Sequence, residues 1–244
     1  MAVVAACGST VGAAPARAWT VVGLGDSVTS GHGCHCRELV GGYADLTAAA
    51  TGREVRAVNL GRDGSTSGDL LADLRADEGV RMAVATADVV LLITGANDLQ
   101  PQLAEWEAGR CRDLGCFDRQ LPQIRQRLAA VLDAVRALRA GRPTQILLPT
   151  YWNAFMDGAA ARRRGHDYQA MSRTVTQRLA ATECAAAAAG AGVSCVDLAP
   201  VFTGPSGDRD ATPLLQDDGD HPNRAGHAAI ARALVARGWP ELER

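Results

Sequence analysis

Apolar residues along this chain form short runs that are separated by longer segments of helical periodicity. The run at 88–94 holds Val, Leu and Ile without alternating polar residues, a pattern typical of a strand covered by helices on both faces. Four other short apolar runs predict strands at 19–24, 54–60, 144–148 and 193–197. We expect the run at 88–94 to lie at the centre of the sheet.

The segments between these runs carry apolar residues three and four positions apart. At 117–140 these residues are Leu121, Ile124, Leu128, Val131, Leu132, Val135 and Leu138. Further helices are predicted at 42–51, 167–189 and 222–237, the last with a proline in its first turn. The stretches 100–116 and 200–220 are rich in Gly, Pro and Asp and are predicted to be loops.

Strands that alternate with helices predict an α/β domain built on a parallel sheet. The chain has 244 residues, and no linker or internal repeat divides it. We therefore expect one domain at 19–244, preceded by a segment at 1–18 that lacks the pattern.

Composition excludes several classes of function. The chain is 47% hydrophobic and 21% charged, which is ordinary for a globular protein, and no apolar run reaches the length of a membrane span. Its formal charge of −2 argues against nucleic acid as a partner. All 25 basic residues are arginine, so chemistry that needs a lysine amine, such as a Schiff base or a P-loop, is excluded.

The segment 1–18 is interpreted as the remnant of an export signal or as a disordered tail. Ala16-Arg17-Ala18 fits a small-residue cleavage pattern, whereas 4–8 resembles a lipobox that would give Cys7 a lipid anchor. The expected location is therefore secreted or on the cell surface as a lipoprotein, with the cytoplasm kept as an alternative.

Apart from Cys7, six cysteines form close pairs in the sequence, namely Cys34/Cys36, Cys111/Cys116 and Cys184/Cys195. Such pairs favour disulfides in an oxidising compartment, although six cysteines allow fifteen connectivities and the sequence does not choose among them. A rival interpretation takes His32, Cys34, His35 and Cys36 as a zinc or copper cluster. Four ligands within five residues do not converge easily on one tetrahedral centre.

Chemically active residues follow the predicted strands and precede the last helix. In open α/β sheets the ligand site lies beyond the carboxyl ends of the strands. The four blocks are Gly25-Asp26-Ser27, Asn59-Leu60-Gly61, Gly95-Ala96-Asn97-Asp98 and Asp218-Gly219-Asp220-His221. In content and order, this set resembles the SGNH hydrolase superfamily, also called the GDSL lipases and esterases. The resemblance extends from about Trp19 to Gly238, and Val28 stands where the name motif has Leu.

The resemblance implies a three-layer α/β/α sandwich, flavodoxin-like, with a five-stranded parallel sheet. It also implies a serine esterase or lipase that forms an acyl-Ser27 intermediate. A serine hydroxyl needs an adjacent base, and His221 is the best candidate for accepting its proton and returning it to the leaving alcohol. Asp218 would orient the imidazole. Asp217 and Asp220 are alternatives, and the family spacing favours Asp218.

The negative charge that develops on the carbonyl oxygen needs hydrogen-bond donors. The resemblance assigns this oxyanion hole to the backbone N–H groups of Ser27 and Gly61 and to the side-chain amide of Asn97. We interpret Asp26 and Asp98 as structural supports of their turns. No metal or organic cofactor is required.

Clues to the substrate are fewer. Tyr151, Trp152 and Phe155 crowd the segment after the fourth strand and are candidates for a substrate-binding wall, with a packed loop as the alternative. Expected substrates are small-molecule or lipid esters, and acetylated glycans are also considered. Alternative functions with the same triad are carbohydrate O-deacetylase, thioesterase and acyltransferase, and an alternative of another class is a non-catalytic cell-surface binding module.

Overall fold

The computed structural model describes residues 17–111 and 113–243. Within these residues, five strands form one sheet in the order β2-β1-β3-β4-β5, and every neighbouring pair is parallel. They are β1 (Trp19–Gly25), β2 (Val55–Gly61), β3 (Val89–Ile93), β4 (Gln145–Pro149) and β5 (Val193–Val196). The expected five-stranded parallel sheet is confirmed, and its order is that of flavodoxin-like folds.

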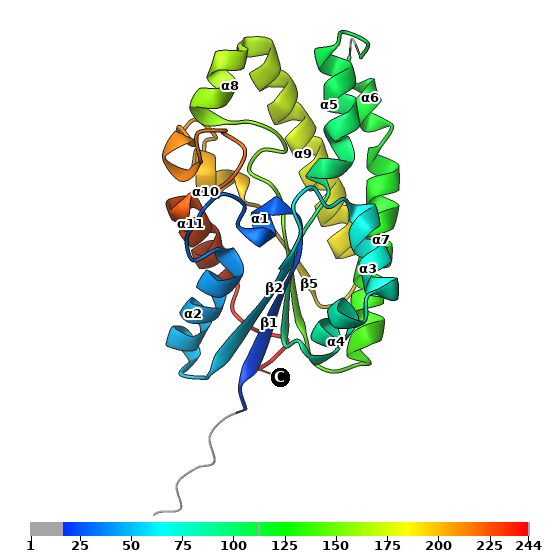
Figure 1. The fold of residues 1–244 in the computed structure, drawn as a ribbon, viewed down its shortest axis with the longest axis vertical. Coiled ribbons are helices and arrows are strands. Elements are labelled where there is room, and N and C mark those ends of the chain that lie inside the picture. The colour runs from blue at the N-terminus through cyan, green and yellow to red at the C-terminus, as the bar shows by residue number, and fades with distance from the viewer. Residues whose placement is uncertain (1–16, 112, 244) are drawn as a thin grey trace, which may run out of the picture.

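Helices cover both faces of this sheet (Figure 1). They are α1 (Ser27–Ser30), α2 (Leu39–Thr51), α3 (Ser67–Ala76), α4 (Glu78–Thr86), α5 (Gln100–Glu107), α6 (Gly115–Asp118), α7 (Leu121–Arg139), α8 (Gly158–Arg164), α9 (His166–Ala188), α10 (Ala199–Thr203) and α11 (Arg224–Val235). Two short 3₁₀ helices, Ala96–Leu99 and Thr212–Leu214, add to them. The helices α2 and α11 pack together on one face, while α3, α4 and α7 lie on the other. The predicted α/β/α layering is therefore confirmed.

The two faces explain why the strand sequences are apolar without alternation. In β1, Val21 belongs to the core beneath α2 and α11, whereas Val22 belongs to the core beneath α3, α4 and α7. All five residues of β3 are buried, and β3 lies between β1 and β4. Burial on both sides leaves no position for a polar side chain, so β3 is the central strand expected from its sequence.

Helix boundaries differ from the predictions where side chains cap or break the chain. The predicted helix at 42–51 begins earlier, at Leu39, because the Glu38 carboxylate accepts hydrogen bonds from the N–H groups of Val40 and Gly41 at 2.5 and 3.0 Å. The predicted helix at 117–140 is divided into α6 and α7 at residues 119–120. The predicted final helix at 222–237 is the shorter α11, which Asn223 caps.

The predicted loops at 100–116 and 200–220 contain helical structure, so that part of the prediction was wrong. Pro101 stands in the first turn of α5, where a missing N–H costs nothing, and Trp106 packs edge-on against Tyr168 of α9. The helix α10 and the 3₁₀ helix Thr212–Leu214 occupy part of the second stretch. Residues in these stretches are ordered by contacts with distant helices, which local composition does not encode.

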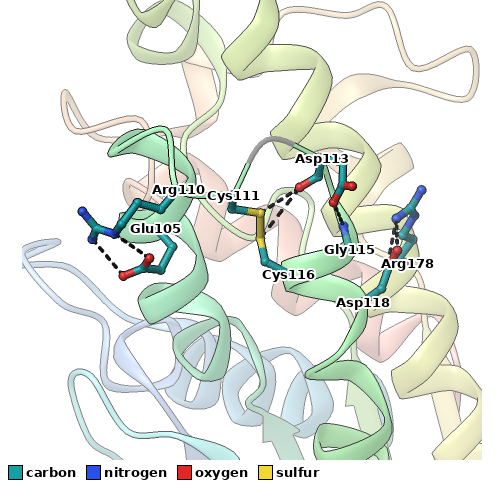
Figure 2. Close-up of a disulfide and its surroundings, with 8 residues drawn as sticks. All are labelled: Glu105, Arg110, Cys111, Asp113, Gly115, Cys116, Asp118 and Arg178. Atoms are coloured by element: carbon teal, nitrogen blue, oxygen red, sulfur yellow. Dashed lines mark hydrogen bonds and ion pairs between the residues drawn. A yellow bond between two sulfur atoms is a disulfide. The ribbon is translucent and has the colours of Figure 1, made fainter.

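All three cysteine pairs are joined as disulfides: Cys34–Cys36, Cys111–Cys116 and Cys184–Cys195. Figure 2 shows Cys111–Cys116 closing the turn between α5 and α6. The same view shows Asp118 of α6 paired with Arg178 of α9, so this segment is fixed to the long helix as well as to itself. Cys184–Cys195 ties α9 to β5 at the edge of the sheet.

The N-terminal predictions fall almost entirely outside the described residues. The predicted export segment 1–18 is described only at Arg17 and Ala18, and the proposed lipid-anchor site Cys7 lies outside. Arg17 pairs with the buried Asp88 carboxylate, which also accepts the Thr20 N–H at 2.8 Å. No helix among the described residues has the length and apolar character needed to cross a bilayer.

Removing the Cys184–Cys195 bridge should lower the free energy of unfolding by about 3 kcal/mol, since a cross-link limits the entropy of the unfolded chain. The test is urea denaturation of the Cys184→Ala/Cys195→Ala double variant at neutral pH. The Cys34→Ala/Cys36→Ala variant is the control, because its bridge closes a much shorter loop and should contribute about 1.5 kcal/mol. Equal losses in both variants would contradict this account.

Candidate active site

The turn that carries Ser27 begins at Gly25, the last residue of β1. Gly25 has φ +134°, and a Cβ on it would lie 1.7 Å from the carbonyl oxygen of Ile93, so only glycine fits. The Asp26 N–H donates to that same oxygen at 3.2 Å. Asp26 then caps α1 by accepting the Val28 N–H at 3.0 Å. These contacts place Ser27 at the first position of α1, above the carboxyl end of the sheet.

Ser27, His221 and Asp218 form a continuous hydrogen-bonded chain. His221 Nε2 lies 2.9 Å from Ser27 Oγ, and His221 Nδ1 lies 2.8 Å from Asp218 Oδ2. The other carboxylate oxygen of Asp218 accepts the backbone N–H groups of Asp220 and His221 at 2.9 and 3.0 Å. Of the three candidate acids, the structure thus places Asp218 against the imidazole. This arrangement can take a proton from a serine hydroxyl and hold the required tautomer of the histidine.

The loop carrying His221 is held from both sides. The N–H of Gln216 donates to the His221 carbonyl at 2.8 Å, and an isolated antiparallel bridge pairs Leu215 with Pro222. Asn223 caps α11 and also donates through its side-chain amide to the Leu215 carbonyl at 2.8 Å. The position of the imidazole therefore depends on backbone contacts that flank it.

Charge in this loop is set by hydrogen bonding as well as by burial. Partial burial acts to raise the pKa of Asp218, but hydrogen bonds from His221 and from the Asp220 backbone N–H outweigh it, and the pKa falls below its usual range. Burial raises the pKa of the neighbouring Asp220 to about 6, while the charge of His221 opposes that shift. At neutral pH the carboxylate in contact with the imidazole is ionised.

Two of the expected oxyanion donors are free to act. No hydrogen bond engages the Ser27 N–H within the part of the chain that the structure describes. Asn97 follows β3, and one hydrogen of its amide donates to the Ser65 carbonyl at 3.0 Å, which leaves the second hydrogen available. Ser27 and Asn97 border the same small cavity.

Asp98 organises the loop around Asn97. Its carboxylate accepts the Ser67 N–H at 2.8 Å and the Ser67 hydroxyl at 2.6 Å. The Arg127 guanidinium of α7 donates to the same carboxylate at 3.0 Å. Asp98 therefore fixes the start of α3 to the turn after β3, in agreement with its interpretation as a support.

The predicted role of Gly61 as an oxyanion donor is corrected by the structure. Its N–H donates to the Asn59 side-chain oxygen at 2.9 Å and is not directed at an oxyanion. A Cβ on Gly61 would lie 2.3 Å from the Ser30 nitrogen, so the glycine is needed because α1 packs directly against the end of β2. Its role is to admit the serine turn, and its N–H is taken by Asn59 and not by an oxyanion.

Gly64 offers the free N–H that Gly61 lacks. It lies in a turn closed by a 3.0 Å hydrogen bond from the Ser65 N–H to the Arg62 carbonyl, with φ +72°. Asp63 on one side of it bonds to Ser30 of α1, and the Ser65 carbonyl on the other side bonds to Asn97. The Gly64 N–H has no acceptor among the described residues. The Asp63-Gly64 dipeptide is the turn signal in the sequence that marks this position.

The aromatic residues after β4 lie mostly in the core. Tyr151, Trp152 and Phe155 are each less than 5% exposed. The Trp152 ring stacks on Phe202 at 4.1 Å between centroids, and Phe155 packs against Phe117 at 5.9 Å. Phe155 is thus a core residue and not part of a wall. Trp152, together with Tyr151, also borders a cavity of about 340 Å³ beside α9.

Tyr151 is the member of this group that borders the cavity beside Ser27. Its hydroxyl donates to the Asp26 carboxylate, which is 1% exposed. Burial raises the pKa of Asp26 to about 6, although the hydrogen bonds from Tyr151 and from Val28 oppose the shift. Tyr151 therefore supports the serine turn from below.

The rival metal cluster does not form in this state of the protein. Cys34 and Cys36 are joined to each other, so neither offers a thiolate. Their sulfur atoms and a ring nitrogen of His227 lie within 4.8 Å of one another, whereas the His32 ring turns away to bond Asp63.

Several known proteins are similar to this chain in sequence pattern or in fold. Residues 24–229 match the sequence model of the GDSL-like Lipase/Acylhydrolase family. A lipase from a goat rumen metagenome is 19% identical with a TM-score of 0.71, covering 91% of this chain and 98% of its own. A catalytic mutant of an acetylxylan esterase from Geobacillus stearothermophilus is 22% identical with a TM-score of 0.61, covering 89% and 93%. At these identities the likeness shows a shared fold. The search of curated proteins gave no match.

As the pH rises, the free energy of unfolding of Asp26→Asn should increase relative to that of the wild type. The pKa of Asp26 is about 6 when folded and about 3.9 when unfolded, so its stabilising contribution is complete below pH 4 and is lost as the pH rises through 6. The Asn side chain does not ionise, so the variant does not lose this contribution. Between pH 4 and pH 7.5 the variant should gain on the order of 2–3 kcal/mol relative to the wild type.

The measurement is urea denaturation of Asp26→Asn and the wild type at both pH values. His227 has its pKa lowered to about 4 by burial and destabilises the fold as the pH falls, but it is common to both proteins and cancels in the difference. If the difference in the free energy of unfolding between the two proteins does not change with pH, the raised pKa of Asp26 is refuted.

Proposed function

The chain belongs to the GDSL-like lipase/acylhydrolase family, and from this premise we propose that it is a serine esterase that hydrolyses carboxylic esters through an acyl-Ser27 intermediate. The observation that carries the proposal is the chain of hydrogen bonds from Ser27 through His221 to Asp218. A binding module would have no need of a hydroxyl, an imidazole and an ionised carboxylate aligned in this order.

In the first half of the reaction, Ser27 Oγ attacks the ester carbonyl carbon while its proton passes to His221 Nε2. The carbonyl oxygen acquires a negative charge, and the N–H groups of Ser27 and Gly64 together with the free amide hydrogen of Asn97 donate to it. The C–O bond to the alcohol then breaks, and His221 returns the proton to the leaving alkoxide. Asp218 stabilises the imidazolium between these two transfers.

In the second half, a water molecule takes the place of the alcohol. His221 accepts its proton, the hydroxide adds to the acyl carbon, and the bond to Ser27 Oγ breaks as that oxygen regains the proton. The products are a carboxylic acid and the free enzyme. Transfer to an alcohol acceptor in place of water would make the same site an acyltransferase.

A second candidate, O-deacetylation of a glycan, is favoured by the cavity beside Ser27. Its volume is about 20 Å³, which is the space of one water molecule or one methyl group. The small side chains of Val28, Ala96 and Ala154 form its apolar part. An acetyl methyl fits this space. The fold neighbour that is an acetylxylan esterase accords with this candidate.

We also propose that the protein works outside the cytoplasm. Three short-range disulfides support an oxidising compartment, because cytosolic thiols are kept reduced. Mass spectrometry of the mature protein from its native host would distinguish cleavage after Ala18, lipid attachment at Cys7 and an unprocessed chain.

The esterase proposal predicts that Ser27→Ala loses about 10⁴-fold or more in kcat on p-nitrophenyl acetate. The wild type and the variant are assayed on a series from acetyl to palmitoyl, with circular dichroism to show that both are folded. Equal activity of the two proteins would reject Ser27 as the nucleophile. Activity that falls by more than about tenfold from acetyl to hexanoyl would favour deacetylation, which acetylated xylan then tests directly.

Asn97→Ala should lower kcat by about 10²- to 10³-fold while KM changes little, because its free amide hydrogen meets charge only in the transition state. The same substitution releases the Ser65 carbonyl, so the melting temperature is recorded beside the kinetics. A rise in KM with an unchanged kcat would assign Asn97 to ground-state binding instead.

A further inference from the structure

A second histidine lies against the catalytic imidazole. The rings of His32 and His221 are 4.7 Å apart between centroids and are tilted by 43°. At this separation the two rings are in contact range for aromatic pairs. His32 belongs to the loop that follows α1, and its N–H donates to the Ser27 carbonyl at 3.0 Å. The ring is therefore mounted directly on the turn that carries the nucleophile.

His32 has its own carboxylate partner. Its Nδ1 lies 2.5 Å from Asp63 Oδ2, and the other oxygen of Asp63 accepts the Ser30 hydroxyl at 2.5 Å. Hydrogen bonds from Ser30 and from His32 lower the pKa of Asp63 below its usual range, so this carboxylate is ionised at neutral pH. The orientation of the His32 ring is set by Asp63 in the same way that Asp218 sets that of His221.

Gln216 links the backbones of the two histidines. Its side-chain amide donates to the His32 carbonyl at 2.7 Å, and its own N–H donates to the His221 carbonyl at 2.8 Å. The relative position of the two rings is therefore fixed through one residue. Half of the His32 side chain is exposed, so this contact does not serve to fill the core.

We propose that His32, held by Asp63, is a positioning residue for His221, whose ring it supports and whose charge environment it sets. This inference rests on the proposed function, in which His221 is the base. Loss of the ring should let the imidazole leave its alignment with Ser27 Oγ. Loss of the carboxylate should make the imidazolium less favourable.

Several other titratable groups face His221. Asp218 and Asp220 lie in its own loop, Asp26 lies in the serine turn, and His227 lies on α11. None of these is altered in the variants below. Differences between the variants and the wild type therefore report on His32 and Asp63 alone.

Three variants separate packing from charge. His32→Ala removes the ring and should lower kcat by about 3- to 10-fold with little change in KM, on the scale of one aromatic contact. His32→Phe keeps a ring and should retain kcat within about twofold. His166→Ala is the matched control, because His166 is an exposed histidine beside an aspartate on α9, and it should change neither constant.

The pH profile of kcat/KM distinguishes a positioning role from a merely structural one, because a structural role would leave the pH of its acidic limb unchanged. In His32→Phe the Asp63 carboxylate has lost its partner and favours the His221 imidazolium more strongly, so the acidic limb should move to higher pH. In Asp63→Asn that negative charge is gone, and the limb should move to lower pH. Each shift should be about 0.3–0.5 pH units, as for a solvent-screened charge pair.

NMR titration of the His221 ring makes the inference testable apart from catalysis. The chain has five histidines, and the spectrum of His221→Asn assigns the signal. If the wild type hydrolyses no ester but the titration shifts in opposite directions in the two variants, the proposed function fails, while the effect of His32 and Asp63 on the His221 ring stands. If neither the acidic limb nor the titration moves, the inference is wrong. A raised KM with unchanged kcat in His32→Ala would also overturn it, since His32 would then bind substrate.

Discussion

The close approach of β1 to β3 at Gly25 is the constraint on which the site depends. No side chain fits between this residue and the Ile93 carbonyl, so the two central strands can end side by side and the chain can turn at once into α1. The same approach brings the serine turn beside the residues that follow β3, including Asn97. A larger residue at position 25 would separate the nucleophile from its oxyanion donor before any catalytic group was altered.

Behind this turn the protein keeps acidic groups away from water. Asp26 and Glu183 are both 1% exposed, and burial raises the pKa of each, to about 6 for Asp26 and well above its usual value for Glu183. The ionised carboxylates of Asp218 and Asp63 are instead partly exposed to solvent, and hydrogen bonds lower their pKa values. The negative charge of Asp218 and Asp63 thus lies on the side where an imidazolium would form.

The sequence predicted the fold more fully than it predicted the site. Each of the five strands lies within one residue of its expected bounds, because burial on both faces leaves a purely apolar run. The catalytic chain of Ser27, His221 and Asp218 was also identified as a set, since its members follow strand ends or precede the last helix. Gly61 was misassigned because a motif gives residue types and does not show where an N–H points. The Asn59 side chain takes that N–H, and only the folded turn reveals it.

What the sequence by itself determined is the list of chemical groups and the order of the layers, because both follow from local periodicity and from residues adjacent in the chain. The tertiary structure decided which groups meet. It brought His32 and Asp63, 31 positions apart, into contact beside His221, and it placed Phe155 in the core and not in the expected substrate wall. Such contacts join elements that are distant in the chain, and their geometry arises only when the sheet and its helices pack together.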